Sequence, residues 1–523
     1  MSISQRSRSF TTMTSVHPPT RPPARMSSTS DDTTAPGLLD SPEPPRVVTR
    51  KRLGLLAGLV MGGIVFAIMP ADLDQTARLT AAIAVLMALW WMTEAIPLAA
   101  TALVPLVAFP MLNVAPIGEV APPYANPIIF LFMGGFLLAL ALQRWNLHRR
   151  IALLTVLLIG TKPRQLIGGF MITTGFLSMW VSNTATAVMM LPIGVSVLVL
   201  VAKMDKGGKP PKNFGIALML GIAYSASIGS LGTIIGTPPN ALLVGYMAET
   251  HGVTIGFGQW MLVGVPMAIV FMAITWFLLT FVFFKPEITE IPGGRAMIQE
   301  EYSKLGKANT GEKLVLVIFI LAAAAWISVP LLWPGSNVAD AVIAMAVALI
   351  LFLTPANLRT GVPLLTWGSA RALPWDILIL FGGGLSLSAQ FTATGLSAWV
   401  GEQVTSLQVL PLVLIIAAIA AIVLLLTELT SNTATAAAFL PLIGGVALGL
   451  GLDPMLLVIP VAIAATCAFM LPVATPPNAI AFSSGYIEIA DMIKGGLWLN
   501  LIALVLTTIT TMTLAAWVFG LVY

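Results

Sequence analysis

Charged side chains are scarce in this sequence. Only 9% of its 523 residues are Asp, Glu, Lys or Arg, and 57% are hydrophobic. A soluble domain has about a quarter of its residues charged. The composition therefore excludes an ordinary soluble domain and predicts an integral membrane protein. Because its apolar runs have the length of membrane helices, we expect an all-α fold class.

Histidine and cysteine are nearly absent. Cys467 is the lone cysteine, so an intramolecular disulfide is excluded, and the three histidines lie in the N-terminal region or in expected loops. An enzyme within the membrane would need a nucleophile–base pair or a metal cluster. The sequence therefore argues against an enzyme. Its basic residues lie in short loops between apolar runs, which also argues against nucleic-acid binding.

The first 49 residues differ from the rest because they are rich in Ser, Thr and Pro and poor in large apolar side chains. Such a segment buries too little surface to fold, so we expect a disordered tail over 1–49. Arginines but no acidic residues precede Asp31. That pattern also fits an organelle transit peptide, so this alternative stays open.

Long apolar runs predict about eleven transmembrane helices and two re-entrant hairpins, an odd number of crossings that places the termini on opposite faces. We expect the hairpins at 165–203 and 408–452. Two full crossings at each place would give the same topology and stay an alternative, because each arm is roughly long enough to cross. An uncharged Ser-Asn-Thr tip favours the hairpin. The crossings fall near 53–69, 78–97, 98–113, 126–146, 213–249, 258–284, 314–333, 339–355, 373–401, 455–482 and 491–521.

The positive charges support this topology. With the N-terminus on the cytoplasmic side, 25 of the 26 Lys and Arg residues fall in the tail or in cytoplasmic loops, and only Arg78 falls outside. Cytoplasmic loops carry the Lys and Arg excess in membrane proteins. We therefore expect a multi-pass protein of the cell (inner) membrane with a cytoplasmic N-terminus and an outer C-terminus.

The hexapeptide Ser-Asn-Thr-Ala-Thr-Ala occurs twice, at 182–187 and 431–436, an offset of 431 − 182 = 249 residues. Phe132 and Phe381 repeat at the same offset, as do Pro192 and Pro441. When the first crossing is left out, five crossings and one hairpin lie on each side of the charged stretch 287–313, and an odd number turns the second half upside down. Two inverted-topology repeats with matched polar tips are typical of secondary transporters.

This organisation predicts four parts. They are the tail 1–49, a first transmembrane helix plus first repeat over 50–285, a cytoplasmic linker over 286–313, and a second repeat over 314–523.

Each Ser-Asn-Thr triplet precedes an Ala-rich run. Ser, Asn and Thr are favoured at helix N-caps, and the helix that follows presents free N–H groups and a partial positive charge to an anion. A second pair of motifs, Thr-Pro-Pro-Asn at 237–240 and 475–478, interrupts later apolar spans. Two adjacent prolines force an unwound segment whose free carbonyl oxygens suit a cation.

No Lys, Arg or His occurs within these four motifs. Helix ends alone would balance a divalent anion poorly, so we expect a bound cation, and neutral oxygens suit Na⁺. Glu428 and Glu94 are acidic residues within apolar spans. Glu428 is interpreted either as a proton carrier or as a structural hydrogen-bonding group, and both interpretations stay open.

The segment Trp91-Met92-Thr93-Glu94-Ala95-Ile96-Pro97, both Ser-Asn-Thr motifs and both Thr-Pro-Pro-Asn breaks resemble the divalent anion/sodium symporter family of dicarboxylate and sulfate transporters. The resemblance covers roughly residues 50–523. It implies a homodimer in membrane lipid, in which a scaffold domain stays fixed while a transport domain carries substrate by an elevator motion.

The same resemblance implies the site residues. The first sodium site would use Ser178, Ser182, Asn183 and the backbone at Gly236, and the second Thr427, Ser431, Asn432 and the backbone at Ala474. Two or more Na⁺ ions would be coupled to transport. Substrate carboxylates would be held by Asn183, Thr184, Thr237, Asn432, Thr433, Thr475 and Pro476.

The leading function hypothesis is therefore Na⁺-coupled symport of C4-dicarboxylates such as succinate, malate or fumarate. A dicarboxylate exchanger and a sodium-sulfate symporter of the same fold are the alternatives. An anion channel is a further class, but two matched, discontinuous sites favour a carrier.

Overall fold

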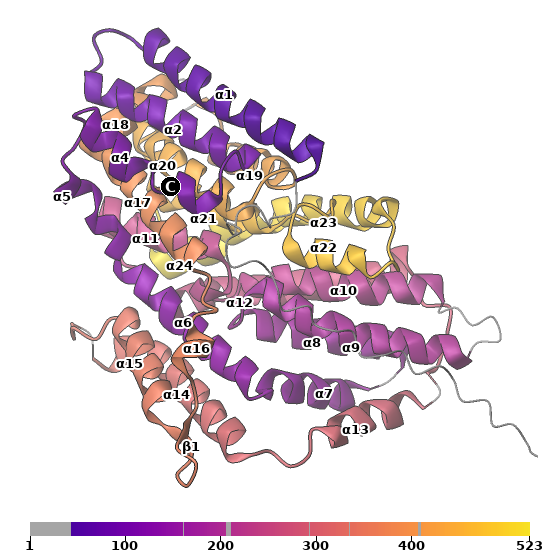
Figure 1. The fold of residues 1–523 in the computed structure, drawn as a ribbon. Helices are drawn as coiled ribbons and strands as arrows, with labels where there is room; N and C mark the ends of the chain where they lie inside the picture. The colour runs from indigo at the N-terminus through magenta and orange to yellow at the C-terminus, as the bar shows by residue number, and fades with distance from the viewer. Residues whose placement is uncertain are drawn as a thin grey trace, which may run out of the picture. The chain divides into compact units, whose positions relative to one another are not determined.

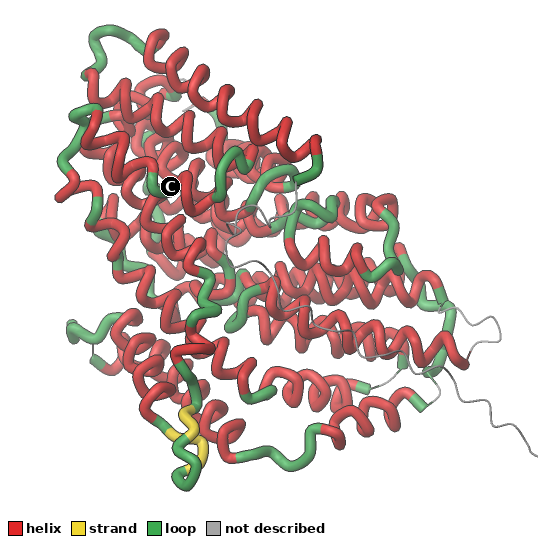
Figure 2. The backbone as a smooth tube through the Cα atoms, in the orientation of Figure 1, coloured by secondary structure: helices red, strands yellow, loops and turns green. Residues whose placement is uncertain are grey.

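The structure is a computed structural model that describes residues 43–160, 162–204, 211–291, 293–333, 335–405 and 409–522. Helices joined by loops make up most of the described chain (Figures 1 and 2). Most of the expected tail, 1–49, lies outside the described residues, and helix α1 begins at Pro45. Strands β1 (Pro355–Asn357) and β2 (Val362–Pro363) form one short antiparallel pair.

Fourteen helices and helical turns precede the linker, and a π-helical segment ends α12. They are α1 (Pro45–Ile68), α2 (Gln75–Thr93), α3 (Leu98–Thr101), α4 (Val104–Met111), α5 (Ile117–Val120), η2 (Pro122–Ala125), α6 (Pro127–Arg144), α7 (Leu147–Ile159), α8 (Pro163–Ser178), α9 (Asn183–Met204), α10 (Lys212–Ser230), η3 (Ile234–Gly236), α11 (Pro238–His251), α12 (Phe257–Phe277) and the π-helical η4 (Leu278–Phe283).

The linker contains α13 (Gly294–Lys304), and the remaining elements follow it. They are α14 (Thr310–Leu332), α15 (Asp340–Leu353), α16 (Trp367–Ala370), α17 (Trp375–Ala393), α18 (Leu396–Gln403), α19 (Leu412–Thr427), α20 (Asn432–Gly449), α21 (Met455–Thr466), α22 (Pro476–Ser483), α23 (Ile489–Thr510), the π-helical η6 (Thr511–Ala515) and α24 (Ala516–Phe519).

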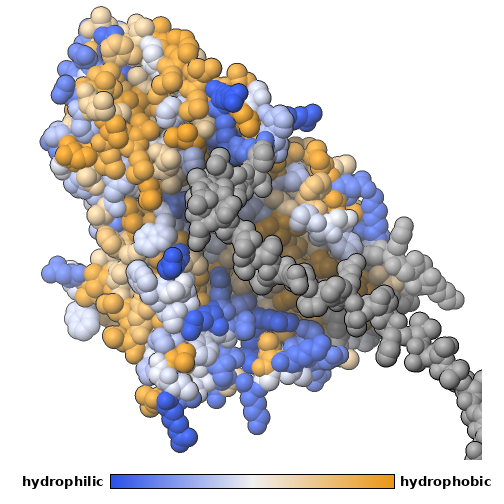
Figure 3. Space-filling view, viewed as in Figure 1, coloured by the Kyte–Doolittle hydropathy of each residue, from blue (hydrophilic) through white to orange (hydrophobic). Residues whose placement is uncertain are grey.

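Among the described residues, ten helices are long and apolar enough to cross a membrane. Large apolar side chains lie on their outer faces, for example Leu53, Leu56 and Leu59 on α1, each more than half exposed. Figure 3 shows hydrophobic residues over much of the surface where α1 and α2 lie. An apolar surface that covers several helices is suited to contact with lipid rather than with water.

Two details differ from the sequence prediction. The expected crossing 98–113 is not one helix, because α3 ends at Thr101 and α4 begins at Val104 with a proline in its first turn. Helix α7 was not predicted at all. Its apolar run is shorter than a membrane crossing and follows His148, Arg149 and Arg150. The sequence pattern therefore predicts a loop at this place.

The two halves repeat the same order of elements. A long helix is followed by a short helix, a helix–turn–helix pair, a broken helix and a long closing helix that contains a π-helical segment. In the first half this series is α6, α7, α8, α9, α10, α11 and α12, and in the second it is α17, α18, α19, α20, α21, α22 and α23.

Residues that repeat at the offset of 249 form close contacts between the two halves. The rings of Phe132 and Phe381 pack edge to face with their centroids 5.0 Å apart. Gly134 of α6 lies against the backbone of Ala344 in α15, where an added Cβ would come within 2.6 Å. Its counterpart Gly383 of α17 lies equally close to the backbone of Ala102. Only glycine permits such close backbone approach, which explains why both positions repeat.

The halves also pack crosswise. Helix α11 of the first half packs against α20 and α21 of the second, while α22 of the second half packs against α9 and α10 of the first. Each broken helix thus lies against the helix–turn–helix pair of the other half.

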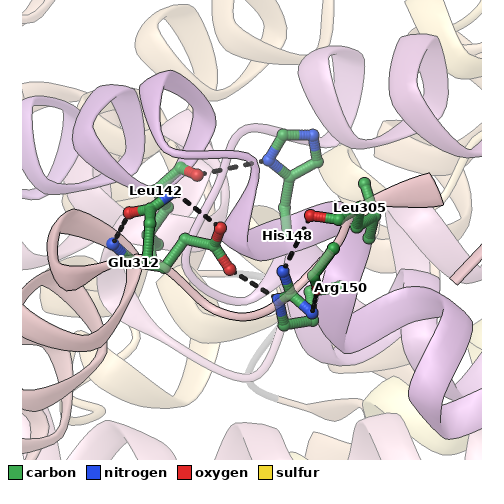
Figure 4. Close-up of polar contacts among 7 residues, drawn as sticks. Leu142, His148, Arg150, Leu305 and Glu312 are labelled. Atoms are coloured by element: carbon green, nitrogen blue, oxygen red, sulfur yellow. Dashed lines mark hydrogen bonds and ion pairs between the residues drawn. The ribbon is translucent and has the colours of Figure 1, made fainter. Parts of the chain in front are cut away.

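The linker is fixed to the first half by charge (Figure 4). The Arg150 guanidinium pairs with Glu312 at the start of α14 and also donates to the carbonyl oxygens of Leu305 and Gly306. Both side chains of the ion pair are nearly buried, at 11% and 7% exposed, and the hydrogen bond to Glu312 raises the pKa of Arg150. In the same view, His148 lies against the Leu142 carbonyl, and burial lowers the pKa of this imidazole.

We expect Glu312→Gln to cost about 3 kcal/mol of unfolding free energy, because it leaves the nearly buried Arg150 without its counter-charge. Glu300→Gln removes a partner from the exposed Glu300–Lys304 pair in the same linker and should cost less than about 1 kcal/mol. Thermal unfolding of the two purified variants in one detergent compares them. Equal unfolding temperatures would contradict a structural role for the Arg150–Glu312 pair.

Candidate functional site

Each Ser-Asn-Thr triplet lies at the turn of a helix–turn–helix pair, between α8 and α9 and between α19 and α20. All six side chains are partly exposed, so both turns remain accessible. Ser182 caps α9, since its Oγ accepts from the backbone N–H of Ala185 at 3.3 Å. Ser431 is the N-cap residue of α20 but makes no side-chain capping bond. Free N–H groups at the start of that helix therefore remain available.

Both turns are anchored in the same way by the last residue of the preceding helix. The Ser178 hydroxyl donates to the carbonyl of Ala226 in α10 at 2.5 Å. The Thr427 hydroxyl, 249 residues later, lies 2.8 Å from the carbonyl oxygen of Ala465 in α21. Both hydroxyls are fully buried. The repeated anchor joins each turn to the helix that precedes the break of its own half.

Three neutral oxygens converge at the second turn. The Thr427 Oγ1 lies 2.8 Å from Asn432 Oδ1 as well as 2.8 Å from the Ala465 carbonyl oxygen. A hydroxyl has only one proton to donate, so it cannot satisfy both acceptors at once. Clustered uncharged oxygens of this kind are what a hard monovalent cation takes as ligands. The sequence analysis named Thr427 and Asn432 but missed the Ala465 carbonyl, because no sequence pattern marks a backbone oxygen.

Both expected breaks are present. Helix α10 ends at Ser230 and α11 begins at Pro238, and helix α21 ends at Thr466 and α22 begins at Pro476. Gly236, Thr237, Ala474 and Thr475 are buried in these breaks, whereas Pro476 is exposed. Thr475 caps α22 through the N–H of Asn478 at 3.3 Å, and Thr237 makes no such bond. The two breaks are therefore similar in backbone but differ in this capping contact.

The last residue of each Thr-Pro-Pro-Asn motif holds its break closed. Asn240 Nδ2 donates to the carbonyl of Thr233 at 2.9 Å, and Asn478 Nδ2 donates to the carbonyl of Leu471 at 3.1 Å. The acceptor lies seven residues earlier in both cases. The sequence analysis counted these asparagines as part of the motifs but assigned them no role. Their repetition after two prolines was the available signal.

The halves meet at a threonine pair. Thr237 Oγ1, in the break of the first half, lies 3.5 Å from Thr466 Oγ1 at the end of α21 in the second half. No hydrogen bond joins the two Ser-Asn-Thr triplets directly within the described part of the chain. The structure thus brings Thr427 together with Asn432, and it brings Thr237 to the other half through Thr466. Thr184, Thr433 and Ser431 take part in neither the Thr427–Asn432 contact nor the Thr237–Thr466 contact.

The two acidic residues within apolar spans have different surroundings. Glu94 is half exposed at the end of α2, where it pairs with Arg50 at 2.8 Å. Glu428 is only 2% exposed and accepts hydrogen bonds from backbone N–H groups of the second break. Among the described residues no cluster of three or more His, Cys, Asp or Glu side chains is suited to a metal ion. Any cation site here depends on neutral oxygens.

Two cavities of about 340 and 270 Å³ lie elsewhere, next to the linker. The larger is lined by residues of α7, α9 and α13, including His148, Arg149 and Glu301. Neither cavity is lined by a residue of the four motifs. The candidate site is described by its hydrogen bonds.

Within the described ranges, ten apolar helices and two helix breaks with matched polar turns define a multi-pass helical membrane protein of the transporter class. Two solved transporters share its fold. The Alcanivorax borkumensis YdaH transporter matches with a TM-score of 0.55 at 13% identity over 91% of this chain and 99% of that one. Neisseria gonorrhoeae MtrF matches with a TM-score of 0.51 at 12% identity over 92% and 96%.

Sequence comparison is more specific. Residues 49–521 match the family described as the sodium:sulfate symporter transmembrane region, and the chain belongs to this family. It is 42% identical to the sodium-dependent dicarboxylate transporter SdcS of Staphylococcus saprophyticus, over 90% of this chain and 93% of that protein. It is 44% identical to the SdcS of Staphylococcus aureus strain USA300, over 87% and 90%. The family resemblance found in the sequence is thereby confirmed.

The threonine contact can be tested by crosslinking. In a Cys467→Ala background, which is free of native cysteine, we expect Thr237→Cys and Thr466→Cys together to form a disulfide on mild oxidation, because their side chains touch. Intact mass and thiol counting would report the bond. Each single substitution is the control and should keep its free thiol. The double variant must be folded and its thiols fully reduced before oxidation. If no disulfide then forms, the result would contradict the observed contact between the halves.

Proposed function

We propose that this protein is a secondary active transporter that couples inward Na⁺ movement to uptake of C4-dicarboxylates such as succinate, malate or fumarate. The single observation that carries the proposal is the set of converging neutral oxygens at Thr427, Asn432 and Ala465, next to a helix break. The names of the related SdcS proteins support both the sodium dependence and the dicarboxylate cargo.

The second sodium site is assigned to Thr427, Ser431, Asn432 and the Ala474 backbone, and the first to Ser178, Ser182, Asn183 and the Gly236 backbone. The donor set fits the ion, because these groups supply hydroxyl, amide and carbonyl oxygens without a fixed charge. Bound Na⁺ supplies the positive charge that a dianion requires at membrane depth. Substrate carboxylates are assigned to Asn183, Thr184, Thr237, Asn432, Thr433, Thr475 and Pro476.

The turns do two things for such a substrate. The helices that begin at Asn183 and Asn432 direct backbone N–H groups and their partial positive charge toward the turn, which favours carboxylate oxygens. The side-chain amides and hydroxyls beside them bind those oxygens and fix their orientation. Partial exposure of both triplets leaves room for a ligand to approach.

The transport cycle belongs to the same proposal. The pairs α8–α9 and α19–α20 are re-entrant hairpins in two inverted repeats, with about eleven crossings and the domain bounds 50–285, 286–313 and 314–523. The crosswise packing of α11 on α20 and of α22 on α9 supports this symmetry. A homodimer with fixed scaffolds carries the site across by an elevator motion. The N-terminus is cytoplasmic and the C-terminus lies outside.

Uptake by proteoliposomes tests the coupling. With labelled succinate outside, we expect initial uptake to rise at least about tenfold when an inward Na⁺ gradient replaces an inward K⁺ gradient, because Na⁺ is the missing counter-charge. Unlabelled dicarboxylate inside the vesicles should not be required. Uptake that needs internal dicarboxylate and ignores Na⁺ would indicate an exchanger, and competition by sulfate alone would indicate a sulfate symporter.

The two turns can be tested separately. We expect Asn183→Ala and Asn432→Ala each to lower succinate uptake more than about tenfold, because each removes an amide that contacts both ion and substrate. Ser196→Ala, an exposed position on α9 whose hydroxyl bonds only within its helix, is the matched control. Retention of near-normal uptake by either asparagine variant would show that the corresponding turn is assigned wrongly.

A further inference from the structure

Glu428 is a carboxylic acid buried inside the apolar part of the protein. It follows Thr427 directly at the end of α19 and is 2% exposed. Burying a carboxylate is costly unless hydrogen bonds replace the lost water. The contacts of this side chain therefore indicate what it does in the protein.

The carboxylate is held by the second break. Its Oε1 accepts from the backbone N–H groups of Phe469 at 2.7 Å and Met470 at 3.0 Å, and its Oε2 accepts from Leu471 at 3.2 Å. A fourth donor, Asn500 Nδ2 on α23, lies 2.7 Å from Oε1. Successive backbone N–H groups of this kind form a concave site that suits a negative charge. No ion pair to Glu428 occurs among the described residues.

The hydrogen bonds continue from Glu428 to the proposed ion site. Leu471, whose N–H binds the carboxylate, accepts with its own carbonyl oxygen from the N–H of Ala474 at 3.2 Å. The same carbonyl accepts from Asn478 Nδ2. Glu428 is thus connected to the proposed second site in two ways. It directly follows Thr427 in the chain, and its hydrogen bond to Leu471 continues to Ala474.

The first half lacks this arrangement. The residue 249 positions before Glu428 is Met179, which carries no charge. There the hydroxyl of Thr233, in the first break, donates to the Met179 carbonyl instead. At this position the first half has one neutral hydrogen bond, whereas the second half has a carboxylate with four hydrogen-bond donors. The duplicated fold does not itself require an acid at this position.

We infer that Glu428 is a positioning residue for the second sodium site: it fixes the backbone of 469–471, and through it Ala474, against Thr427 and Asn432. The inference rests on the proposed function. It goes beyond that proposal because it makes the two ion sites unequal. Sodium affinity at the second site depends on Glu428, whereas the intrinsic affinity for the dicarboxylate does not.

Glu428→Gln is the principal test, since it keeps the shape but replaces one acceptor oxygen with an NH₂ group that faces N–H donors. We expect the Na⁺ concentration for half-maximal uptake to rise about tenfold, from the loss of charge-assisted hydrogen bonds. The KM for succinate at saturating Na⁺ should change less than about threefold. Glu94→Gln removes a half-exposed carboxylate away from the site and should leave both values unchanged.

Two further variants separate geometry from charge and from proton transfer. Glu428→Asp keeps the charge but withdraws it by one methylene, so it should also weaken sodium activation. Asn500→Ala removes one donor and should raise the half-maximal Na⁺ concentration by a smaller factor. Normal sodium activation in Glu428→Asp would overturn positioning in favour of charge alone. A pH-dependent uptake that disappears in Glu428→Gln, with unchanged sodium activation, would overturn it in favour of a proton carrier.

A measurement without transport separates this inference from the proposed function. We expect Na⁺, compared with choline, to raise the unfolding temperature of the purified wild type and of Glu94→Gln, and to raise that of Glu428→Gln less. If Na⁺ does not raise the unfolding temperature of the wild type and does not drive uptake, the proposed function is wrong. An equal shift in wild type and Glu428→Gln would overturn the positioning role alone. If Glu428→Gln does not fold, Asn500→Ala decides the question by the same comparison.

Discussion

Hydrocarbon offers no hydrogen bonds, so every polar group placed at membrane depth must find its partners within the protein. The structure meets this requirement at two broken helices in a repeated way. An asparagine closes each break, and a hydroxyl anchors each helix turn to the preceding helix. Around Thr427 three neutral oxygens converge on one hydroxyl proton, so these oxygens are the groups to which we assign cation binding. The rest of the architecture supports these exceptions.

Crosswise packing gives these local features a common location. Because α11 packs on α20 and α22 packs on α9, each broken helix lies against the helix–turn–helix pair of the opposite half. The two breaks also approach each other, since Thr237 contacts Thr466. Contacts such as Phe132 with Phe381, and the close approach at Gly134 and Gly383, hold the halves together near their matched positions. Substitution of either glycine by a larger residue would push the neighbouring backbones apart, because an added Cβ has no room there.

The two halves are similar in backbone and different in chemistry. Thr475 caps its helix and Thr237 does not, and Glu428 has no charged counterpart at Met179. Both halves keep the backbone pattern, because the helix breaks and the close contacts depend on it. Side chains packed behind the breaks are less constrained, so they differ between the halves.

The sequence by itself determined the membrane class, the family, the repeat offset of 249 residues and the positions of both breaks, because these follow from hydropathy, proline chemistry and repeated motifs. The family resemblance also predicted that Thr427 and Asn432 act together, and the structure brings their side chains into contact. It missed α7, whose apolar run is too short to indicate a membrane helix, and it predicted 98–113 as one helix. Only the tertiary structure decided that Glu428 binds the second break, that the Ala465 carbonyl joins Thr427, and that Thr237 contacts Thr466. Those contacts join residues tens to hundreds of positions apart and use backbone groups that every residue carries, so no local pattern distinguishes them.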